Sequence, residues 1–394
     1  MKKILFSVIL FSCCNVTFCQ SLSPLDAEGT ALYQAGKMTE AIAAFQKALV
    51  ANPAGLYSLN ALGNIYISQN KNQEAYDLAL KGIKLSNGAV NFVVLQAKAA
   101  IKIGKPAEAV KVLDAFLQKN QPDFMLLFVK GNALAALNEQ QQAIGLYSKS
   151  IDANPDFPPA YLERAKLFAG LERWPQALND YNHYITLVSD DADAYNLRGI
   201  VFFKTNVTEK ALDDFNSSLQ LNPKQEFALA NRGVLYRNSN QVDKALSDFN
   251  AAIAIDPAYA DPYFEKAILY DNQKDYNAAL PLINKAAELQ PSWSIYRGEQ
   301  SKILLALDKS VEGLAAAQEA IRLDPKNPDG YLFKTVAFYN LEKFDEALQA
   351  VNDGISSIPG NYLYYSLRAS IYRKKGNNAL ADADDAQAKE LSTH

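Results

Sequence analysis

A pattern with a period of about 34 residues repeats along this chain and constrains its fold more than any other feature. In residues 192–225 the pattern is aromatic, glycine, aromatic, then alanine, phenylalanine and proline: Tyr195, Gly199, Phe202, Ala211, Phe215 and Pro223. The corresponding positions of residues 226–259 hold Leu229, Gly233, Tyr236, Ala245, Phe249 and Pro257. A fixed period of this length indicates small units that stack on their neighbours, with no single closed core.

The register continues to the end of the chain without an insertion. A small residue that marks the second half of each unit recurs once in every period, at Ala41, Ala75, Ala109, Ala143, Ala177, Ala211, Ala245, Ala279, Gly313, Ala347 and Ala381. A matching small position recurs in each first half, for example at Gly29, Gly131 and Gly233. Small side chains at both positions predict two helices whose backbones cross closely.

Prolines support a division into helix pairs. Seven of them follow the second half of a unit, where a helix has to stop: Pro53, Pro155, Pro223, Pro257, Pro291, Pro325 and Pro359. Each unit is therefore expected to be two antiparallel helices of roughly 12–14 residues. Pro281 stands inside a second half and predicts a slight kink or a late helix start. The array spans residues 22–394, in units 22–55, 56–89, 90–123, 124–157, 158–191, 192–225, 226–259, 260–293, 294–327, 328–361 and 362–394.

Residues 1–19 have the layout of a secretory signal peptide. Two lysines precede an apolar run, and a more polar stretch follows it. The run is shorter than the roughly 20 residues of a membrane span. We expect cleavage after Cys19, which would leave a mature chain without cysteine, exported to the bacterial periplasm or the outer membrane. The alternative is a lipoprotein, because residues 10–13 resemble a lipobox that would leave a lipid anchor on Cys13.

These anchors resemble the tetratricopeptide repeat. The resemblance implies an all-α fold, an α-solenoid wound as a right-handed superhelix, in which the first helix of each unit lines a concave groove. Proteins of this kind mostly bind extended peptides or protein helices in that groove. The subclass that clamps chaperone tails carries lysine at the fifth position of the first helix, and this chain has none there.

The resemblance also implies which side chains face the groove. Positions two, five, nine, twelve and thirteen of the first helix point into it. In the central units these positions hold aromatic, amide and charged residues, a mixture suited to an extended polypeptide. The expected partner-binding residues are Phe128, Asn132, Lys166, Asn196, Phe203, Lys204, Phe227, Arg237, Asn238, Phe264, Asp271 and Asn272.

The sequence does not point to catalysis, a metal or a cofactor. His183 is the only histidine before the last residue, and no nucleophile or base stands in a recognisable motif with it. The acidic run at residues 190–193 lacks the glycine and the distal glutamate of a calcium loop and fits a helix cap. A net charge of −4 does not indicate a nucleic-acid partner.

An arginine–aspartate pattern recurs in four units. Arginine occupies the seventh position of the first helix, and aspartate follows in the second helix at a constant separation. We predict that each arginine bridges to the aspartate of its own unit or of a stacked neighbour and fixes the register of the helices. The pairs are Arg164 with Asp180, Arg198 with Asp214, Arg232 with Asp248, and Arg368 with Asp384.

The sequence thus favours a non-enzymatic scaffold that captures a protein partner in the bacterial cell envelope. A second hypothesis is an envelope protein that guides an exported polysaccharide along the curved surface, and an enzyme ranks third.

Overall fold

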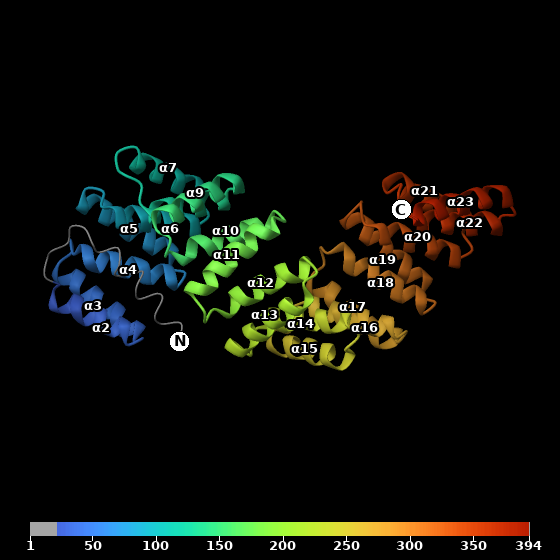
Figure 1. Cartoon of the computed structure of the whole chain (residues 1–394), viewed down its shortest axis with the longest axis horizontal. Coiled ribbons are helices and arrows are strands. Elements are labelled where there is room, and N and C mark those ends of the chain that lie inside the picture. Colours follow the sequence, from blue (N-terminus) through green and yellow to red (C-terminus); the bar gives the residue numbers. More distant parts are fainter. Residues whose placement is uncertain (1–21, 394) are drawn as a thin grey trace. The chain divides into compact units, whose positions relative to one another are not determined.

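The computed structural model describes residues 22–393, and these fold into 22 α-helices joined by short turns, without a β-strand (Figure 1). The expectation of an all-helical solenoid of paired repeats is confirmed. The chain divides into two compact units, unit 1 up to Asp190 and unit 2 from Asp191 onwards. The expected signal peptide and Cys13 lie outside the described residues.

Unit 1 holds five helix pairs: α2 (Pro24–Gln34) and α3 (Met38–Ala51), α4 (Leu56–Ser68) and α5 (Asn72–Ser86), α6 (Val90–Lys102) and α7 (Pro106–Leu117), α8 (Phe124–Ala136) and α9 (Gln140–Ala153), α10 (Pro158–Gly170) and α11 (Trp174–Leu187).

Unit 2 holds six helix pairs: α12 (Ala192–Lys204) and α13 (Thr208–Leu221), α14 (Glu226–Asn238) and α15 (Val242–Ile255), α16 (Asp261–Asn272) and α17 (Tyr276–Leu289), α18 (Ser294–Ala306) and α19 (Ser310–Leu323), α20 (Pro328–Asn340) and α21 (Phe344–Ser357), α22 (Tyr362–Lys374) and α23 (Asn378–Ser392).

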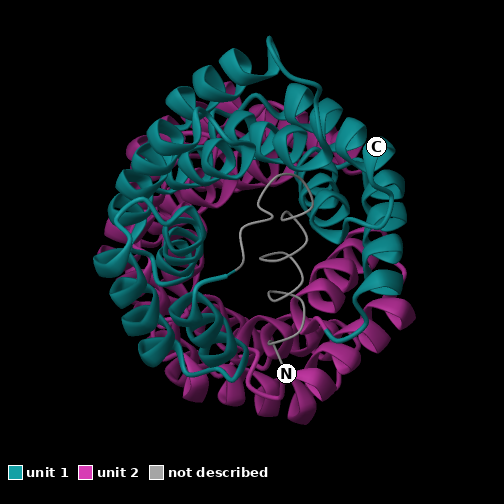
Figure 2. Ribbon diagram, turned by 90° about the vertical axis from the view of Figure 1, so that its left-hand side faces the viewer, with its two compact units in different colours: residues 1–190 teal, residues 191–394 magenta. Residues whose placement is uncertain are grey.

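Each unit is a curved stack in which one set of helices lies inside (Figure 2). We call the even-numbered helices the first helices of the repeats and the odd-numbered ones the second helices. Several successive first helices contact each other, such as α4 with α6 and α18 with α20. Within the described part of each unit, no second helix makes a comparable contact with the next second helix. The first helices therefore lie on the inner side of the curve.

Every repeat makes the same turn between its two helices. The residue that begins the turn after the first helix has a positive φ in all eleven repeats, for example +59° at Asn70, +61° at Lys274 and +77° at Gly104. The next amide donates to a carbonyl in the last turn of the first helix, as Asp275 does to Tyr270 at 2.9 Å. This is the Schellman ending, which satisfies carbonyls that the helix leaves free.

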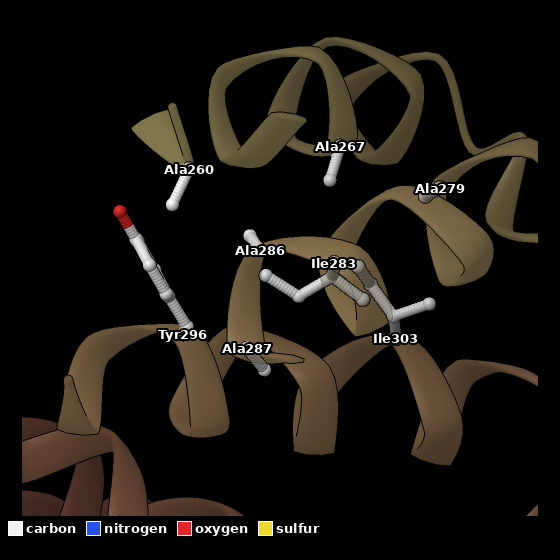
Figure 3. Packing of buried hydrophobic residues seen from close by; sticks show 8 residues of the cluster. All are labelled: Ala260, Ala267, Ala279, Ile283, Ala286, Ala287, Tyr296 and Ile303. Carbon is white, nitrogen blue, oxygen red and sulfur yellow. The ribbon is translucent and has the colours of Figure 1, made fainter. Parts of the chain in front are cut away.

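The core of each repeat continues into the next one. In the eighth repeat Ala267 of α16 and Ile283 of α17 are fully buried, together with Ile303 of the following helix α18 (Figure 3). Many side chains at the crossings are alanine, which lets the backbones approach. Pro281 lies inside α17, yet that helix begins at Tyr276 in register with the other second helices, so a late start is excluded.

Candidate functional site

The four predicted arginine–aspartate pairs form, each within its own repeat. In every pair the arginine Nε and Nη2 donate to the two carboxylate oxygens at 2.6–2.8 Å. The aspartate side chains are at most 8% exposed, and the arginines 17–22%. The hydrogen bonds to the aspartates raise the pKa of Arg198, Arg232 and Arg368 above its ordinary value.

Three of these arginines also reach the second helix of the preceding repeat. Nη1 of Arg232 donates to Oδ1 of Asn216 at 2.8 Å, and Nη1 of Arg368 donates to Oδ1 of Asn352 at 2.7 Å. Arg164 makes the matching bond to the Ser148 hydroxyl at 2.8 Å. Each of the three thus connects three helices. All three guanidinium nitrogens of each of these arginines bond to neighbouring helices, which indicates a structural role.

The predicted groove residues of unit 1 are distributed between core and surface. Phe128 is 8% exposed, and its ring lies 5.7 Å from Tyr147 and 5.1 Å from Phe157. Asn132 accepts a hydrogen bond from the Tyr147 hydroxyl at 2.8 Å. Lys166 is exposed and pairs with Glu163 of the preceding helical turn at 2.8 Å.

In unit 2 several predicted residues contact neighbouring helices. Buried Asn196 accepts from Asn231 at 3.0 Å. Phe203 packs against the core formed with Ala211, Phe215 and Leu235, and the Phe264 ring lies 4.9 Å from Tyr296. The residues that remain open to a partner are exposed: Lys204, Phe227, Asn238 and Asn272.

Arg237 and Asp271 belong to ion pairs between successive first helices. Arg237 of α14 lies 3.1 Å from Glu265 of α16, and Lys302 of α18 lies 2.6 Å from Asp271 of α16. Glu299 lies 3.3 Å from the same lysine. Glu265, Glu299 and Lys302 were not among the residues predicted from the sequence. Each pairing occurs in only one repeat, so no repeated spacing could reveal it. Lys302 does, however, occupy the ninth position of its first helix, one of the positions expected to face the groove.

Three carboxylates on the inner side of unit 2 lie where burial disfavours their charged form. Burial raises the pKa of Glu265; Arg237 opposes the shift and Asp261 adds to it. Burial likewise raises the pKa of Glu299 and of Asp329, against the effect of Lys302 on both. The inner side of unit 2 therefore holds acidic groups whose charge is only partly compensated.

The described residues give no sign of a metal or membrane-spanning element. In residues 22–393, no three histidine, cysteine or acidic side chains are grouped so as to hold a metal ion. None of the helices there combines the length and the apolar character that crossing a membrane requires.

Comparisons with known proteins agree with this architecture. A sequence profile described as the tetratricopeptide repeat matches residues 27–89, 94–158, 162–226 and 299–362, and two further profiles of the same description match residues 226–259 and 260–292. Protein STIP1 homolog of Dictyostelium discoideum is 40% identical over 67 residues. That match spans 17% of this chain and only 12% of the length of that relative.

A solved structure shows the same fold at low identity, and a second is similar over most of the chain. A tetratricopeptide repeat protein from Parabacteroides merdae is 17% identical, with a TM-score of 0.50 over 63% of this chain and 98% of that one. A chain of the APC/C hetero-tetramer Cut9–Hcn1 is 13% identical, with a TM-score of 0.49 over 95% and 94% of the two chains. Because the repeat profile matches most of its sequence, this chain belongs to the tetratricopeptide repeat family.

Proposed function

We propose that the protein is a non-enzymatic scaffold that binds a partner protein on the inner side of unit 2, along the first helices. Tetratricopeptide repeats generally bind proteins or peptides. The observation that supports this surface is the exposure of large side chains on helices that also carry partly compensated charges. Phe227 at the start of α14 is 51% exposed, and Lys204, Asn238 and Asn272 stand open on the same set of helices.

The proposed location is the bacterial cell envelope. The support is the signal-peptide layout of residues 1–19, with cleavage after Cys19 or, alternatively, a lipid on Cys13. A fractionation experiment with the full chain tests this proposal. Intact mass of the recovered protein distinguishes a mature chain that begins at Gln20 from an acylated one. Recovery of the unprocessed chain in the cytosol would refute export.

Partner capture from an envelope extract tests the proposed function. We expect Phe227→Ala combined with Lys204→Glu to abolish capture, because both side chains are exposed and neither belongs to a buried core. Phe203 and Arg237 are less suitable targets, since Phe203 packs on a core and Arg237 forms an ion pair. The matched control is Val311→Ser on the second helix α19, where the side chain is 66% exposed. Unchanged capture by the double variant would refute the surface.

A polysaccharide ligand remains the second candidate, supported by the exposed aromatic rings of Trp293 and Tyr362. It predicts that the chain retains an exported glycan in the same extract and that Trp293→Ala releases it. Retention of a protein, sensitive to Phe227 but not to Trp293, favours the first proposal.

A further inference from the structure

The starts of the first helices in unit 2 carry acidic and apolar residues in strict alternation. Six successive repeats have, at the same position of the period, Asp193, Phe227, Asp261, Ile295, Asp329 and Leu363. The three apolar members are 51%, 47% and 39% exposed in chain order. Of the acidic members, Asp193 is exposed, and Asp261 and Asp329 are half-buried. We call these six residues the alternating row.

Contacts between successive repeats show that the members of the alternating row are neighbours. Gln225, just before α14, donates to Asp193 at 2.5 Å, and Tyr296 of α18 donates to Asp261. The Phe227 ring lies 5.1 Å from Tyr259, just before α16. The row therefore runs without a break along the helix starts from α12 towards α18.

The same holds at the other end of the row. Asn327, at the N-cap of α20, donates to the Ser294 hydroxyl at 3.0 Å, and Tyr364 of α22 donates to the Pro328 carbonyl at 2.8 Å. The Asp329 side chain is so close to α18 that a Cβ added at Gly298 would lie 3.1 Å from it. The α12, α14, α16, α18, α20 and α22 labels in Figure 1 mark the helices that carry the row.

Two members of the row have a second carboxylate close by. Asp261 acts electrostatically on Glu265, and Asp329 acts on Glu299; both effects raise the pKa of the glutamate beyond what burial does. Like charges held together in a partly buried setting repel each other, and a bound cation would relieve that repulsion. The two acidic pairs, whose glutamates already face Arg237 and Lys302, flank Ile295, so acidic and apolar groups alternate along the row.

We propose that the alternating row binds an extended polypeptide of a partner protein in which basic and apolar side chains alternate at a fixed spacing. Neighbouring packed helices are roughly 8–10 Å apart, so like members of the row recur every roughly 16–20 Å. A segment in the extended polyproline II conformation covers that distance in about six residues, since it rises roughly 3.1 Å per residue and brings every third side chain to the same face. Lysine or arginine therefore recurs about every sixth residue, with an apolar residue midway.

This inference rests on the proposed function, because it names the chemistry of the partner for the same surface. It differs from a general affinity for basic peptides, since the order of the residues matters as well as their charge.

Binding of synthetic peptides to the full chain tests the proposal. The probe is a fluorescent peptide with lysine at about every sixth position, leucine midway and proline or serine elsewhere, which favours the polyproline II conformation. One control peptide has the same composition with all lysines first and all leucines last. A second control replaces lysine by glutamate. We expect the probe to bind at least about tenfold more tightly than either control and to weaken as salt is raised.

Variants of the row locate the site. Asp329→Asn and Ile295→Ser should each weaken probe binding by about tenfold. The matched controls are Asp243→Asn on α15 and Val311→Ser on α19, which alter exposed residues of second helices and should leave affinity unchanged. Thermal unfolding of all four variants excludes loss of folding as the cause.

Three results would overturn the inference: equal binding of the block-ordered peptide, binding of the glutamate peptide, or wild-type affinity in both row variants. A negative result in the peptide-binding experiment can be distinguished from failure of the proposed function. If an envelope protein is still captured and its capture still depends on Phe227, the scaffold function stands and only the partner chemistry is wrong.

Discussion

Single glycines show how closely the two helices of a repeat meet. A Cβ added at Gly233 would lie 2.6 Å from the Phe249 ring, and one at Gly29 would lie 2.7 Å from the Phe45 ring. Glycine inside a helix normally costs stability relative to alanine, so its use here indicates that the aromatic ring needs the space. The aromatic residue and the glycine therefore form one packing unit.

Replacing Gly233 by alanine is expected to destabilise the protein by about 1–3 kcal/mol, because the ring of Phe249 has to move out of a filled core. Gly145→Ala is the matched control. Gly145 is also inside a helix, but a Cβ there meets nothing within 4 Å. The control should stabilise by about 0.5–1 kcal/mol through helix propensity. Chemical denaturation of both variants measures the contrast, and equal effects of the same sign would contradict it.

The arginine–aspartate pairs test how much an ion pair across three helices contributes. Asp248→Asn is expected to lower the free energy of unfolding by about 2 kcal/mol, since it leaves the partly buried guanidinium of Arg232 without its charged partner. Arg232→Met with Asp248→Leu should cost less than the sum of the single changes, because no unpaired charge remains. Strictly additive losses in urea denaturation would show that the pair is not coupled.

Glu299 gives stability a predictable pH dependence. Its pKa is raised by burial, with Lys302 opposing and Asp271 and Asp329 adding to the shift. The folded state therefore holds a proton more tightly than the unfolded state does. The resulting stability is fully present below the unfolded pKa of about 4.3 and is lost as pH rises through the higher folded value.

Glu299→Gln removes this titration. The variant is expected to be more stable than the wild type near neutral pH, and the difference should shrink as the pH falls towards about 4. Denaturation curves at a series of pH values measure the difference. A gap that stays constant over that range, or that widens in acid, would contradict the assignment.

At the scale of the helices, the sequence predicted the contacts that recur in several repeats but not the contacts found in a single repeat. The fixed period determined the helix pairs, and the constant separation of arginine from aspartate revealed pairs such as Arg164 with Asp180. Arg237 and Glu265 form a contact that no other repeat copies, so periodicity carried no signal for it. Phe128 was assigned to the groove by its position, but its ring packs against Phe157 at the start of the next repeat.

The positive φ of the turn between the two helices was not predicted, although the residue types at that position carry a sign of it. Asparagine or glycine occupies seven of the eleven positive-φ positions, and glutamate, lysine or aspartate occupies the others. Side chains with a Cβ are strained in this region by about 1–2 kcal/mol. The repeated backbone therefore imposes the same conformation even where the local residue disfavours it.

Lys274→Gly is expected to stabilise the protein by about 0.5–1 kcal/mol, because relief of strain exceeds the added chain entropy of the unfolded state. Gly104→Ala is the converse change at φ +77°, and nothing within 4 Å of the added Cβ would clash. It should destabilise by a similar amount. Melting temperatures of the two variants give the comparison, and a loss of stability in Lys274→Gly would show that the lysine side chain contributes more than its strain costs.

At the scale of the whole molecule, stability should be local. Among the described helices, substantial contacts join only elements that are adjacent or next but one along the chain. Such an array behaves approximately as a line of repeats coupled to their nearest neighbours. Damage in one repeat of unit 2 should therefore weaken its neighbours and leave distant repeats of the same unit intact.

Hydrogen exchange of Gly233→Ala tests this locality. Protection of backbone amides should fall in α14, α15 and α16, whose packing involves the Phe249 ring or the helix next to it. Protection in α22 and α23 should stay at the wild-type level, because no contact carries the disturbance that far. Asp384→Asn is the reciprocal variant, expected to lower protection in α21, α22 and α23, because Arg368 also bonds to Asn352 of α21, and to leave α14 and α15 unchanged. A uniform fall across unit 2 in either variant would mean that its six repeats open as one cooperative body, and that coupling between repeats outweighs the stability of each repeat by itself.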